Sequence, residues 1–533
     1  MNYKHFGIMI DCSSNAVPKV ETVKHLIDQM EKMGYNLLEL CTDDTYKIAD
    51  EPYFGYLRGG YSEAEIKEMD AYAKLHGVEL VPCIQTLGHL GQLVKLPHYA
   101  SIVDISNILL VDEPKTYELI EKMFQTLSKC YTSRKINLGM DEAHLLGLGN
   151  YLRKHGYTDR HEIFLRHLNA VVKIAEKYGF QPHMWSDMFF CMASDGQYYT
   201  KGVHISEEVK RQIPENVALC YWDYGEHPIE ESIFDEMMSA HKEFDRELWF
   251  AGGAWTWNGF APHNKFSLLA MQPAMRQVVR HGIENVMVTI WGGDGFECSF
   301  FSVLPSLYAI RQYALGNFDE ASIEKGFLKT FGISYQSMMT LDLPNKSKFN
   351  PDAAKVSSAS KTLLFNDCFL GWKDSALQAE LPIPYGEYAK QLALAKKTGG
   401  EYSYIFDVLQ SLCFALEIKA DLGLRTRKAY REKDRLALER LLDDYAEAER
   451  RVADFYQCFR RLWMKENKPF GWEVHEVRLG GLRSRLLDCR ARIEEYLLGA
   501  VENIPELDED ILPYADWKLQ YNRYRGLVSV SDI

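Results

Sequence analysis

Two adjacent carboxylic acids, Asp141 and Glu142, follow a short apolar run at residues 135–140. Ile136 and Leu138 alternate with a polar residue there, which predicts the end of a buried strand. Like charges resist ionising together, so such a pair suits acid–base chemistry on a sugar or a carbonyl. A solvated turn or a helix N-cap would put the same two acids in this place. The rest of the chain has to decide between these interpretations.

The elements that must position the pair follow one another in a regular alternation of strand and helix. Apolar runs predict strands at 6–11, 37–40, 78–83, 135–138, 182–185, 217–221, 248–251 and 286–290. Helical periodicity fills most of the intervals, and Ser62 with Glu65 forms a capping box before one of these helices. Eight strand–helix repeats predict a (β/α)₈ TIM barrel. A doubly wound open sheet is the alternative, but no glycine-rich phosphate loop supports it.

Polar or aromatic residues follow nearly every predicted strand. A barrel places its active site at the carboxyl ends of its strands, so these residues are candidates for one shared site. Singly, each is equally well explained as a cap or a turn residue. The residues in this position are Asp11, Asp43, His89, Asp141, Glu142, Asp187, Asp223, Trp257 and Asp294.

The chain changes character near residue 319, where helical patterns replace strand signals. Long amphipathic helices are expected at 402–424, 433–465 and 477–498. We therefore expect a catalytic barrel over residues 1–318 and an α-helical C-terminal domain over 319–533. The segment 468–473 interrupts two helices and is expected to reach the barrel mouth or a partner subunit. The long helices would also suit a homodimer.

Composition excludes several classes of partner. The net charge of −14 argues against binding to nucleic acid or to an anionic membrane. No apolar stretch approaches membrane-spanning length, and no export signal is recognised at the N-terminus. The 11 cysteines are scattered and odd in number, as expected for reduced thiols in a cytoplasmic protein. No zinc-ligand spacing occurs, so neither a metal nor another cofactor is expected. A helicase-type ATPase, suggested by Asp-Glu-Ala-His at 141–144, lacks its phosphate loop.

Several ordered segments resemble those of the β-N-acetylhexosaminidases of glycoside hydrolase family 20, in particular the bacterial cytoplasmic type with a helical C-terminal domain. The resemblance covers roughly residues 5–315. It implies an exo-acting enzyme that removes terminal β-linked N-acetylhexosamine from oligosaccharides by a retaining, substrate-assisted mechanism, without a cofactor. The segments that carry it are 38–44, 59–61, 81–89, 136–142, 185–187 and 221–223.

The resemblance also implies roles for individual residues. Asp141 would orient the acetamido group of the substrate, Glu142 would be the general acid/base, and His89 would support both. Tyr221 would hydrogen-bond the acetamido oxygen. Trp185 and Trp291 would wall the acetamido pocket, and the ring that stacks under the sugar would be Trp291, Trp255 or Trp257. The remaining expected substrate-binding residues are Asp11, Asp223, and Asp294 or Glu297 for the outer hydroxyls. For each aromatic ring or acid, a packed core position or a turn is the alternative.

Three departures from the family pattern bear on specificity. Ser14 stands where the family has an arginine that binds sugar hydroxyls, so another residue must do this. Asn137 and Met140 replace a histidine and a glycine, and Trp291 begins a Trp-Gly-Gly-Asp segment in place of Trp-x-Glu. The preference between gluco and galacto substrates stays open. So do two rival functions, a barrel glycosidase with a conventional carboxylate nucleophile and a non-catalytic amino-sugar-binding protein.

Overall fold

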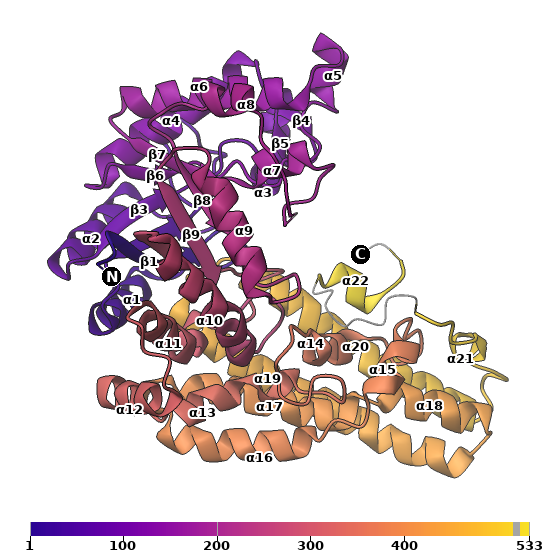
Figure 1. Ribbon diagram of the computed structural model, residues 1–533. Helices are drawn as coiled ribbons and strands as arrows, with labels where there is room; N and C mark the ends of the chain where they lie inside the picture. The colour runs from indigo at the N-terminus through magenta and orange to yellow at the C-terminus, as the bar shows by residue number, and fades with distance from the viewer. Residues whose placement is uncertain (1, 200, 515–522, 532–533) are drawn as a thin grey trace.

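The computed structural model describes residues 2–199, 201–514 and 523–531. Eight parallel strands close into a barrel in the order β1-β10-β9-β8-β7-β6-β3-β2 (Figure 1). Every predicted strand is present to within two residues, so the predicted barrel is confirmed and the open sheet is excluded. The barrel strands are β1 (His5–Asp11), β2 (Leu37–Cys41), β3 (Glu79–Cys83), β6 (Lys135–Asn137), β7 (Gln181–Trp185), β8 (Ala218–Trp222), β9 (Leu248–Gly253) and β10 (Asn285–Ile290).

Helices cover the outside of the barrel. The predicted capping box is present, because the Ser62 hydroxyl accepts a hydrogen bond from the Glu65 backbone N–H and the Glu65 carboxylate accepts one from the Ser62 backbone N–H. The main outer helices are α1 (Val20–Met33), α2 (Glu63–Leu75), α4 (Pro114–Cys130), α6 (Arg160–Lys177), α9 (Glu231–Lys242), α10 (Asn264–His281) and α11 (Leu304–Ala314). Shorter elements lie in the connections between the barrel strands: α3 (Gly91–Val94), β4 (Val103–Ile105), β5 (Ile108–Leu109), α5 (Asn150–His155), α7 (Asp187–Ala193) and α8 (Glu207–Gln212).

Strand alternation sorts the barrel side chains into two apolar clusters. Strand residues that face outward, such as Ile8, Leu38 and Leu219, belong to the large cluster that includes the outer helices. The smaller cluster fills the barrel interior and contains Met9, Leu37, Cys41, Val81, Cys83, Trp185, Ala218, Cys220, Trp249, Ala251 and Met287. Because successive strand residues point to opposite faces, the parity of a residue in its strand decides whether it faces the barrel axis.

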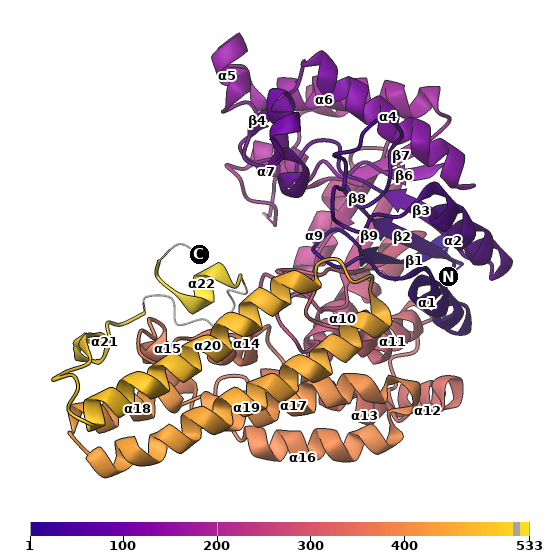
Figure 2. The same ribbon diagram turned by 180° about the vertical axis from the view of Figure 1, so that it is seen from behind.

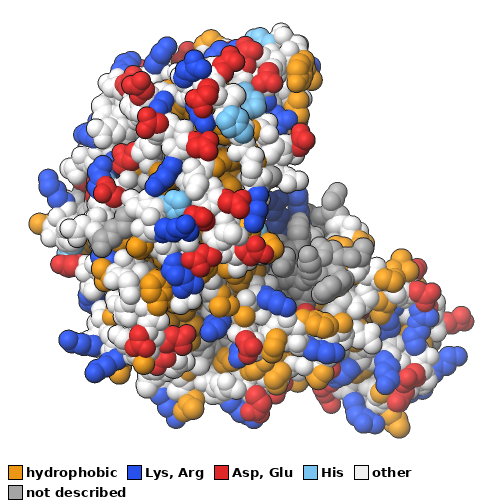
Figure 3. Space-filling view, viewed as in Figure 1, with side chains coloured by type: hydrophobic (Ala, Val, Ile, Leu, Met, Phe, Trp, Pro, Cys, Tyr) orange, Lys and Arg blue, Asp and Glu red, His pale blue; other side chains and the backbone are white. Residues whose placement is uncertain are grey.

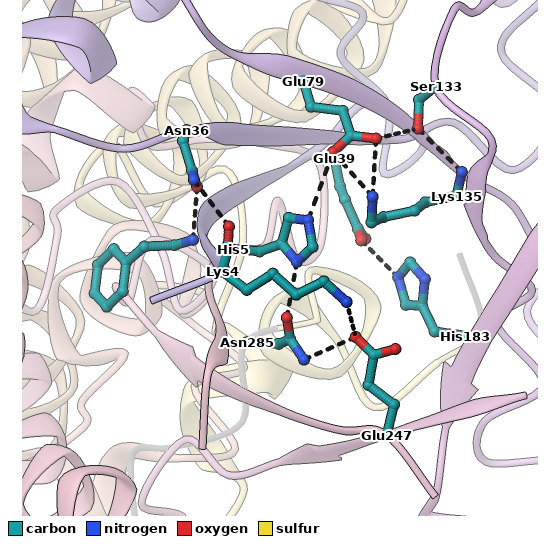
Figure 4. A network of polar contacts seen from close by, with 11 residues as sticks. Lys4, His5, Asn36, Glu39, Glu79, Ser133, Lys135, His183, Glu247 and Asn285 are labelled. Atoms are coloured by element: carbon teal, nitrogen blue, oxygen red, sulfur yellow. Dashed lines mark hydrogen bonds and ion pairs between the residues drawn. The ribbon is translucent and has the colours of Figure 1, made fainter. Parts of the chain in front are cut away.

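A polar network spans the lower part of the barrel, at and inside the amino-terminal ends of the strands (Figure 4). Lys135 Nζ donates to both carboxylate oxygens of Glu79 at 3.1 Å. Within the barrel, His183 Nε2 lies 2.6 Å from Glu39 Oε1. These groups lie away from the carboxyl ends of the strands, where barrels carry out chemistry, so the network is separate from the expected site.

All regular elements described after residue 319 are helices. The longest, α19, has 32 residues and packs beside α17 and α20 (Figure 2). The structure assigns α12 (Glu320–Phe331), α13 (Tyr335–Met339), α14 (Ala359–Phe365), α15 (Asp374–Glu380), α16 (Tyr385–Ala395), α17 (Ser403–Lys419), α18 (Leu422–Arg431), α19 (Arg435–Glu466), α20 (Trp472–Leu497), α21 (Pro505–Asp508) and α22 (Arg525–Val528). The division of the chain at residue 318 stays a prediction.

The predicted helix at 402–424 is wrong in one respect, since the chain turns after α17 and continues as α18. The first turn of α18 packs closely against another segment of the chain. Gly423, in the first turn of α18, lies against the backbone of Cys368, where a Cβ atom would come within 2.8 Å of the carbonyl oxygen. Only glycine allows this approach.

The turn between α19 and α20 docks on the barrel. The Lys468 backbone N–H donates to the Val17 carbonyl at 2.8 Å, and Asn15 Nδ2 donates to the Gly471 carbonyl at 2.9 Å. Gly471 has a φ of 86°, and a Cβ atom there would lie 2.4 Å from the Asn15 carbonyl oxygen. The segment 468–473 therefore reaches the barrel mouth, one of its two predicted destinations.

Acidic and basic side chains are interspersed on the face shown in Figure 3, which is indented between the barrel and the helical region. Within the described residues, no helix combines the length and the apolar character needed to cross a bilayer. All eleven cysteines are unpaired, and each except Cys458 is buried.

Candidate active site

A cavity of about 1110 Å³ opens at the carboxyl ends of the barrel strands. It reaches from the loops after the strands to α20 of the helical region. Five residues that the sequence placed at the site do not line it: Asp187, Tyr221, Asp223, Trp255 and Glu297. The expected site residues that do line it are Asp11, Asp43, His89, Asp141, Glu142, Trp185, Trp257, Trp291 and Asp294.

A strained backbone turn positions the two acids. After β6 the chain passes through three residues with positive φ, Gly139 at 69°, Met140 at 71° and Glu142 at 49°. Only glycine takes this conformation without cost, so the two others store strain that the surroundings must hold. Asn137 Oδ1 accepts from the Gly139 N–H at 3.0 Å, and Gln85 Oε1 accepts from the Met140 N–H at 3.2 Å.

Asp141 is held in its charged form. Gln85 Nε2 donates to Asp141 Oδ1 at 2.9 Å, and His89 Nε2 lies 3.2 Å from Asp141 Oδ2. Burial opposes ionisation, but the charge of His89 and these polar contacts outweigh it and hold the pKa of Asp141 below its usual value. Asp141 in turn raises the pKa of His89 to about 10, so the imidazole is cationic at neutral pH.

Glu142 is shifted in the opposite direction. Burial, and then the charge of Asp141, raise its pKa, although His89 opposes this from 3.5 Å. About half of the side chain (48%) stays accessible because it faces the cavity. Two neighbouring acids with pKa values displaced in opposite directions suit general acid–base catalysis.

Asp187, which follows β7, holds the backbone of Glu142 in place. Its Oδ2 accepts from the Glu142 N–H at 2.9 Å. Burial, followed by the charge of Asp141, raises the pKa of Asp187 to about 8, so this carboxyl is mainly protonated at pH 7. A neutral acid here anchors Glu142 without adding a third negative charge to the site.

Aromatic rings form one wall of the cavity. Trp185 and Trp291 have ring centroids 6.2 Å apart and an interplanar angle of 52°. Trp257 also lines the wall and stacks on the buried Trp255 at 3.9 Å. Trp255 therefore supports a cavity ring from behind. Tyr224, which sequence reasoning did not assign a role, lines the same wall.

Tyr221 and Asp223 lie behind the barrel wall. In β8, Ala218 and Cys220 face the interior, so the parity of the strand turns Tyr221 toward the outer helices. The Tyr221 hydroxyl donates to Asp223 Oδ2 at 2.5 Å, and His227 Nε2 lies 2.8 Å from the same oxygen. The sequence shows the alternation of β8, but only the folded barrel shows which of its two faces points to the axis.

Asp11 lines the cavity, but its carboxylate is occupied by the protein. Oδ1 accepts from the N–H groups of Ser13 and Ser14 at 2.7 and 3.0 Å and from the Ser13 hydroxyl at 2.9 Å. Oδ2 accepts from the Gly292 N–H at 2.9 Å. Asp11 thus ties the loop after β1 to the loop after β10.

The two acids after β10 are paired with cations of the helical region. Lys361 Nζ of α14 lies 3.2 Å from Asp294 Oδ2 and 2.7 Å from Glu297 Oε2. Arg478 of α20 contacts Asp294 Oδ1 at 3.1 Å and Glu297 Oε1 at 3.3 Å. Asp294 and Arg478 line the cavity, while Glu297 is buried behind them. Sequence reasoning missed both cations, although the interruption at 468–473 pointed to this end of α20.

The triad of His89, Asp141 and Glu142 also has the spacing of a metal site, with one potential ligand atom from each within 4.8 Å of the others. In the metal-free protein Asp141 raises the pKa of His89 to about 10, so a metal ion would have to displace a proton from this imidazole in order to bind.

Two protein-family models match successive parts of the chain. Residues 3–233 match the model of the glycosyl hydrolase family 20 catalytic domain, and residues 336–524 match that of the glycoside hydrolase 20C C-terminal domain. Hexosaminidase D of Bos taurus is 26% identical over 224 residues, which are 39% of this chain and 60% of the bovine protein. Its human counterpart is 26% identical over 223 residues, 39% of this chain and 43% of the human protein.

The chain thus spans less than two thirds of the length of these relatives. Among solved structures, the β-N-acetylhexosaminidase of Bacteroides fragilis is similar with a TM-score of 0.48 and 18% identity, covering 62% of this chain and 70% of that one. The two family models follow the order of the barrel and the helical region and together span most of the chain. The chain belongs to glycoside hydrolase family 20.

Proposed function

We propose that this protein is an exo-acting β-N-acetylhexosaminidase that cleaves terminal β-linked N-acetylhexosamine with retention of configuration. The observation that carries the proposal is the pair at the tip of β6. Gln85 and His89 hold the pKa of Asp141 below its usual value, whereas burial and the charge of Asp141 raise the pKa of the neighbouring Glu142. Most retaining glycosidases use a protein carboxylate as nucleophile, but a substrate-assisted mechanism uses the acetamide of the sugar itself.

In this mechanism the acetamide oxygen attacks the anomeric carbon of its own sugar and forms an oxazolinium intermediate. The attack is intramolecular, so the substrate brings its own nucleophile. Positive charge develops on the acetamide nitrogen, and an ionised Asp141 stabilises that charge. The cationic His89, 3.2 Å from Asp141 Oδ2, keeps the carboxylate ionised and oriented.

Glu142 acts twice. Protonated, it donates to the departing glycosidic oxygen, and its conjugate base then takes a proton from the water that opens the intermediate. The hydrogen bond from the Glu142 N–H to Asp187 holds the backbone during both steps. Burial and the charge of Asp141 raise the pKa of Glu142, which favours the acid needed first.

The aromatic wall would enclose the acetamido group. Trp185 is almost fully buried and Trp291 and Trp257 stand beside it at the mouth, so the rings can exclude water from the methyl group and one sugar face. With Tyr221 turned away from the cavity, we assign Tyr224 the hydrogen bond to the acetamide oxygen. Tyr224 is the neighbouring tyrosine that lines the cavity.

The test uses 4-nitrophenyl N-acetyl-β-D-glucosaminide and its galacto epimer with the wild type, Asp141→Asn and Glu142→Gln. We expect the wild type to hydrolyse at least one substrate and each variant to lose on the order of 10²- to 10⁴-fold in turnover. An NMR time course should show β-configured product first. Near-wild-type turnover by either variant, or α-configured product formed first, would refute the assignment.

One observation favours a second candidate, a glycosidase with a conventional carboxylate nucleophile. Glu226 also lines the cavity, and burial followed by the charge of Glu142 raises its pKa. A raised pKa leaves less of the Glu226 carboxylate ionised at a given pH, and only the ionised form is a nucleophile, which makes this candidate the weaker one. Such an enzyme would hydrolyse 4-nitrophenyl β-D-glucoside, which has no acetamide. The substrate-assisted mechanism requires that it does not.

Two further proposals concern the setting of the enzyme. The eleven unpaired thiols suit a reducing compartment, so we place the protein in the cytoplasm with imported oligosaccharides as substrates. Activity found mainly outside fractionated cells would contradict this. We also propose a homodimer formed through the long C-terminal helices. Light scattering after size-exclusion chromatography gives the mass directly, and a monomer mass would exclude the dimer.

A further inference from the structure

The two acids after β6 stand between two unlike halves of the cavity. In the ring of strands, β6 has β7 on one side and β3, followed by β2, on the other. The half that begins at β7 is lined by aromatic rings, which include Trp185, Tyr224, Trp257 and Trp291. The half formed by the loops after β3 and β2 is lined by other residues, among them Leu96, Tyr56 and Leu57.

The position of the general acid assigns a different sugar to each half. Glu142 has to reach the glycosidic oxygen, so the terminal sugar lies on one side of its carboxyl group and the leaving sugar on the other. In the proposed function, on which this inference rests, the aromatic wall encloses the terminal sugar. The leaving sugar therefore extends toward the loops after β3 and β2.

Two side chains in the loop after β2 are exposed to solvent although one is aromatic and the other aliphatic. Tyr56 is 52% exposed and Leu57 is 67% exposed, and both line the cavity. Leu57 also has a φ of 59°, a backbone conformation that costs free energy in any residue except glycine. Neither the exposed apolar surface nor this backbone stabilises the free protein. Their combination at the edge of a cavity is typical of a ligand-binding surface.

The residues on either side of Tyr56 and Leu57 hold this part of the loop in place. At Gly55 a Cβ atom would lie 2.1 Å from the Asp44 carbonyl oxygen, so the loop touches the barrel backbone there. Arg58 Nε pairs with Asp44 Oδ1 at 3.0 Å. The two exposed side chains are thus presented by a loop that is anchored at both of its neighbouring residues.

A third side chain continues this surface away from the cavity. Tyr53 is 44% exposed, does not line the cavity, and has its ring centroid 6.0 Å from that of Tyr56. We call Tyr53, Tyr56 and Leu57 the rim platform. It carries no charge and combines apolar faces with two phenolic hydroxyls. A neutral sugar ring, which has C–H groups on its faces and hydroxyls at its edge, is complementary to such a surface.

We propose that the rim platform binds the sugars that follow the terminal residue of an oligosaccharide, with Tyr56 and Leu57 at the leaving sugar and Tyr53 at the next one. The platform is continuous with the cavity on the side from which the leaving group departs, and this continuity argues for the substrate chain as its occupant. The preferred substrates are then neutral trisaccharides and longer chains rather than short conjugates.

The test compares methyl N-acetyl-β-D-glucosaminide, diacetylchitobiose and triacetylchitotriose as substrates of the full-length enzyme. A methyl group has no ring to place on the platform, so kcat/KM in the wild type should rise from the methyl glycoside to the disaccharide and again to the trisaccharide. Tyr56→Ala should lower kcat/KM on both chito-oligosaccharides by on the order of tenfold and change it by no more than about twofold on the methyl glycoside. Tyr53→Ala should lower it on triacetylchitotriose only.

Three further variants separate a binding role from a structural one. Leu57→Gly suits the φ of 59° and removes the apolar side chain, so it should fold and still lose part of the preference for longer chains. Tyr56→Phe keeps the ring and should keep most of that preference. Tyr157→Ala is the matched control, because Tyr157 is exposed and does not line the cavity, and it should behave as the wild type does.

Equal losses on all three substrates in Tyr56→Ala would mean that Tyr56 acts through the fold, which would overturn the proposal. A loss seen with octyl N-acetyl-β-D-glucosaminide but not with the chito-oligosaccharides would assign the platform to an apolar aglycone and overturn it as well. A wild type that gains nothing from the longer chains overturns this inference, while hydrolysis of either 4-nitrophenyl glycoside leaves the proposed function intact. A wild type inactive on every one of these glycosides overturns the proposed function.

Discussion

Replacing His89 by Asn tests how the site sets the ionisation of both acids. His89 Nε2 lies 3.2 Å from Asp141 Oδ2 and 3.5 Å from Glu142 Oε2. Its backbone has a φ of 56°, a conformation that asparagine tolerates better than most residues. His89→Asn therefore removes the positive charge with little change to the backbone.

The separations give the size of the effect. With an effective dielectric constant of roughly 20, a unit charge at either distance interacts with a carboxylate by about 5 kcal/mol. Water in the open cavity screens part of this, so we expect a loss of roughly 10- to 100-fold in kcat/KM at the wild-type optimum. Without the cation the pKa of Asp141 rises, and so does that of Glu142.

The direction of both shifts fixes the pH profile. Activity requires an ionised Asp141 on the acidic limb and a protonated Glu142 on the basic limb. Both limbs should therefore move to higher pH in His89→Asn. The acidic limb should move further, because His89 is the largest single influence that lowers the pKa of Asp141, whereas its influence on Glu142 is secondary to burial and to Asp141.

The assay is kcat/KM on an aryl N-acetylglucosaminide from about pH 3 to pH 9, which covers both limbs. His98→Asn is the control, because its side chain is 47% exposed and does not line the cavity. The control should keep the wild-type profile. Limbs that stay in place, or move to lower pH, in His89→Asn would refute the electrostatic account of the site.

Three other predictions follow from single contacts. Glu142→Gln should flatten the basic limb of the pH profile along with its loss of turnover, because the titrating acid is gone; a limb that persists would assign the acid elsewhere. Tyr224→Phe should lower kcat by about tenfold or more, because the hydrogen bond to the acetamide oxygen is lost. Tyr221→Phe should leave kcat unchanged and lower the free energy of unfolding in urea by about 1–2 kcal/mol. The reverse pattern would restore Tyr221 to the site. Lys361→Met should lower the free energy of unfolding by about 3–5 kcal/mol, because it leaves the buried Glu297 carboxylate with one cation fewer. The control Lys390→Met, at an exposed position, should change it by no more than about 0.5 kcal/mol. Equal effects of the two variants would mean that the buried ion pair contributes nothing.

The barrel was predictable because its signals are local. Each strand is an apolar run that ends in a polar residue, and its periodicity needs no knowledge of the rest of the chain. The same holds for Asp141 and Glu142, whose place at a strand tip follows from the residues on either side. Carboxyl ends of parallel strands meet at one face, so the shared site followed from topology.

The tertiary structure decided which candidates face that site. Tyr221 and Asp223 carry the right chemistry at a strand end, but the register of β8 turns Tyr221 to the outer helices, where it binds Asp223. The carboxylate of Asp11 is consumed by backbone N–H groups that come together only when β1 and β10 pair. Neither outcome can be deduced from residue type.

The ion pair between Arg478 and Asp294 is the clearest case of a contact that sequence patterns do not reveal. Nothing near Asp294 in the sequence indicates a cation, because the partner is on a helix that reaches the mouth only after α19 and α20 have packed and the turn at Gly471 has docked on Asn15. Local patterns determine which segments become strands and helices. Contacts between distant segments determine the charges that those segments meet, since they depend on how complete elements pack together.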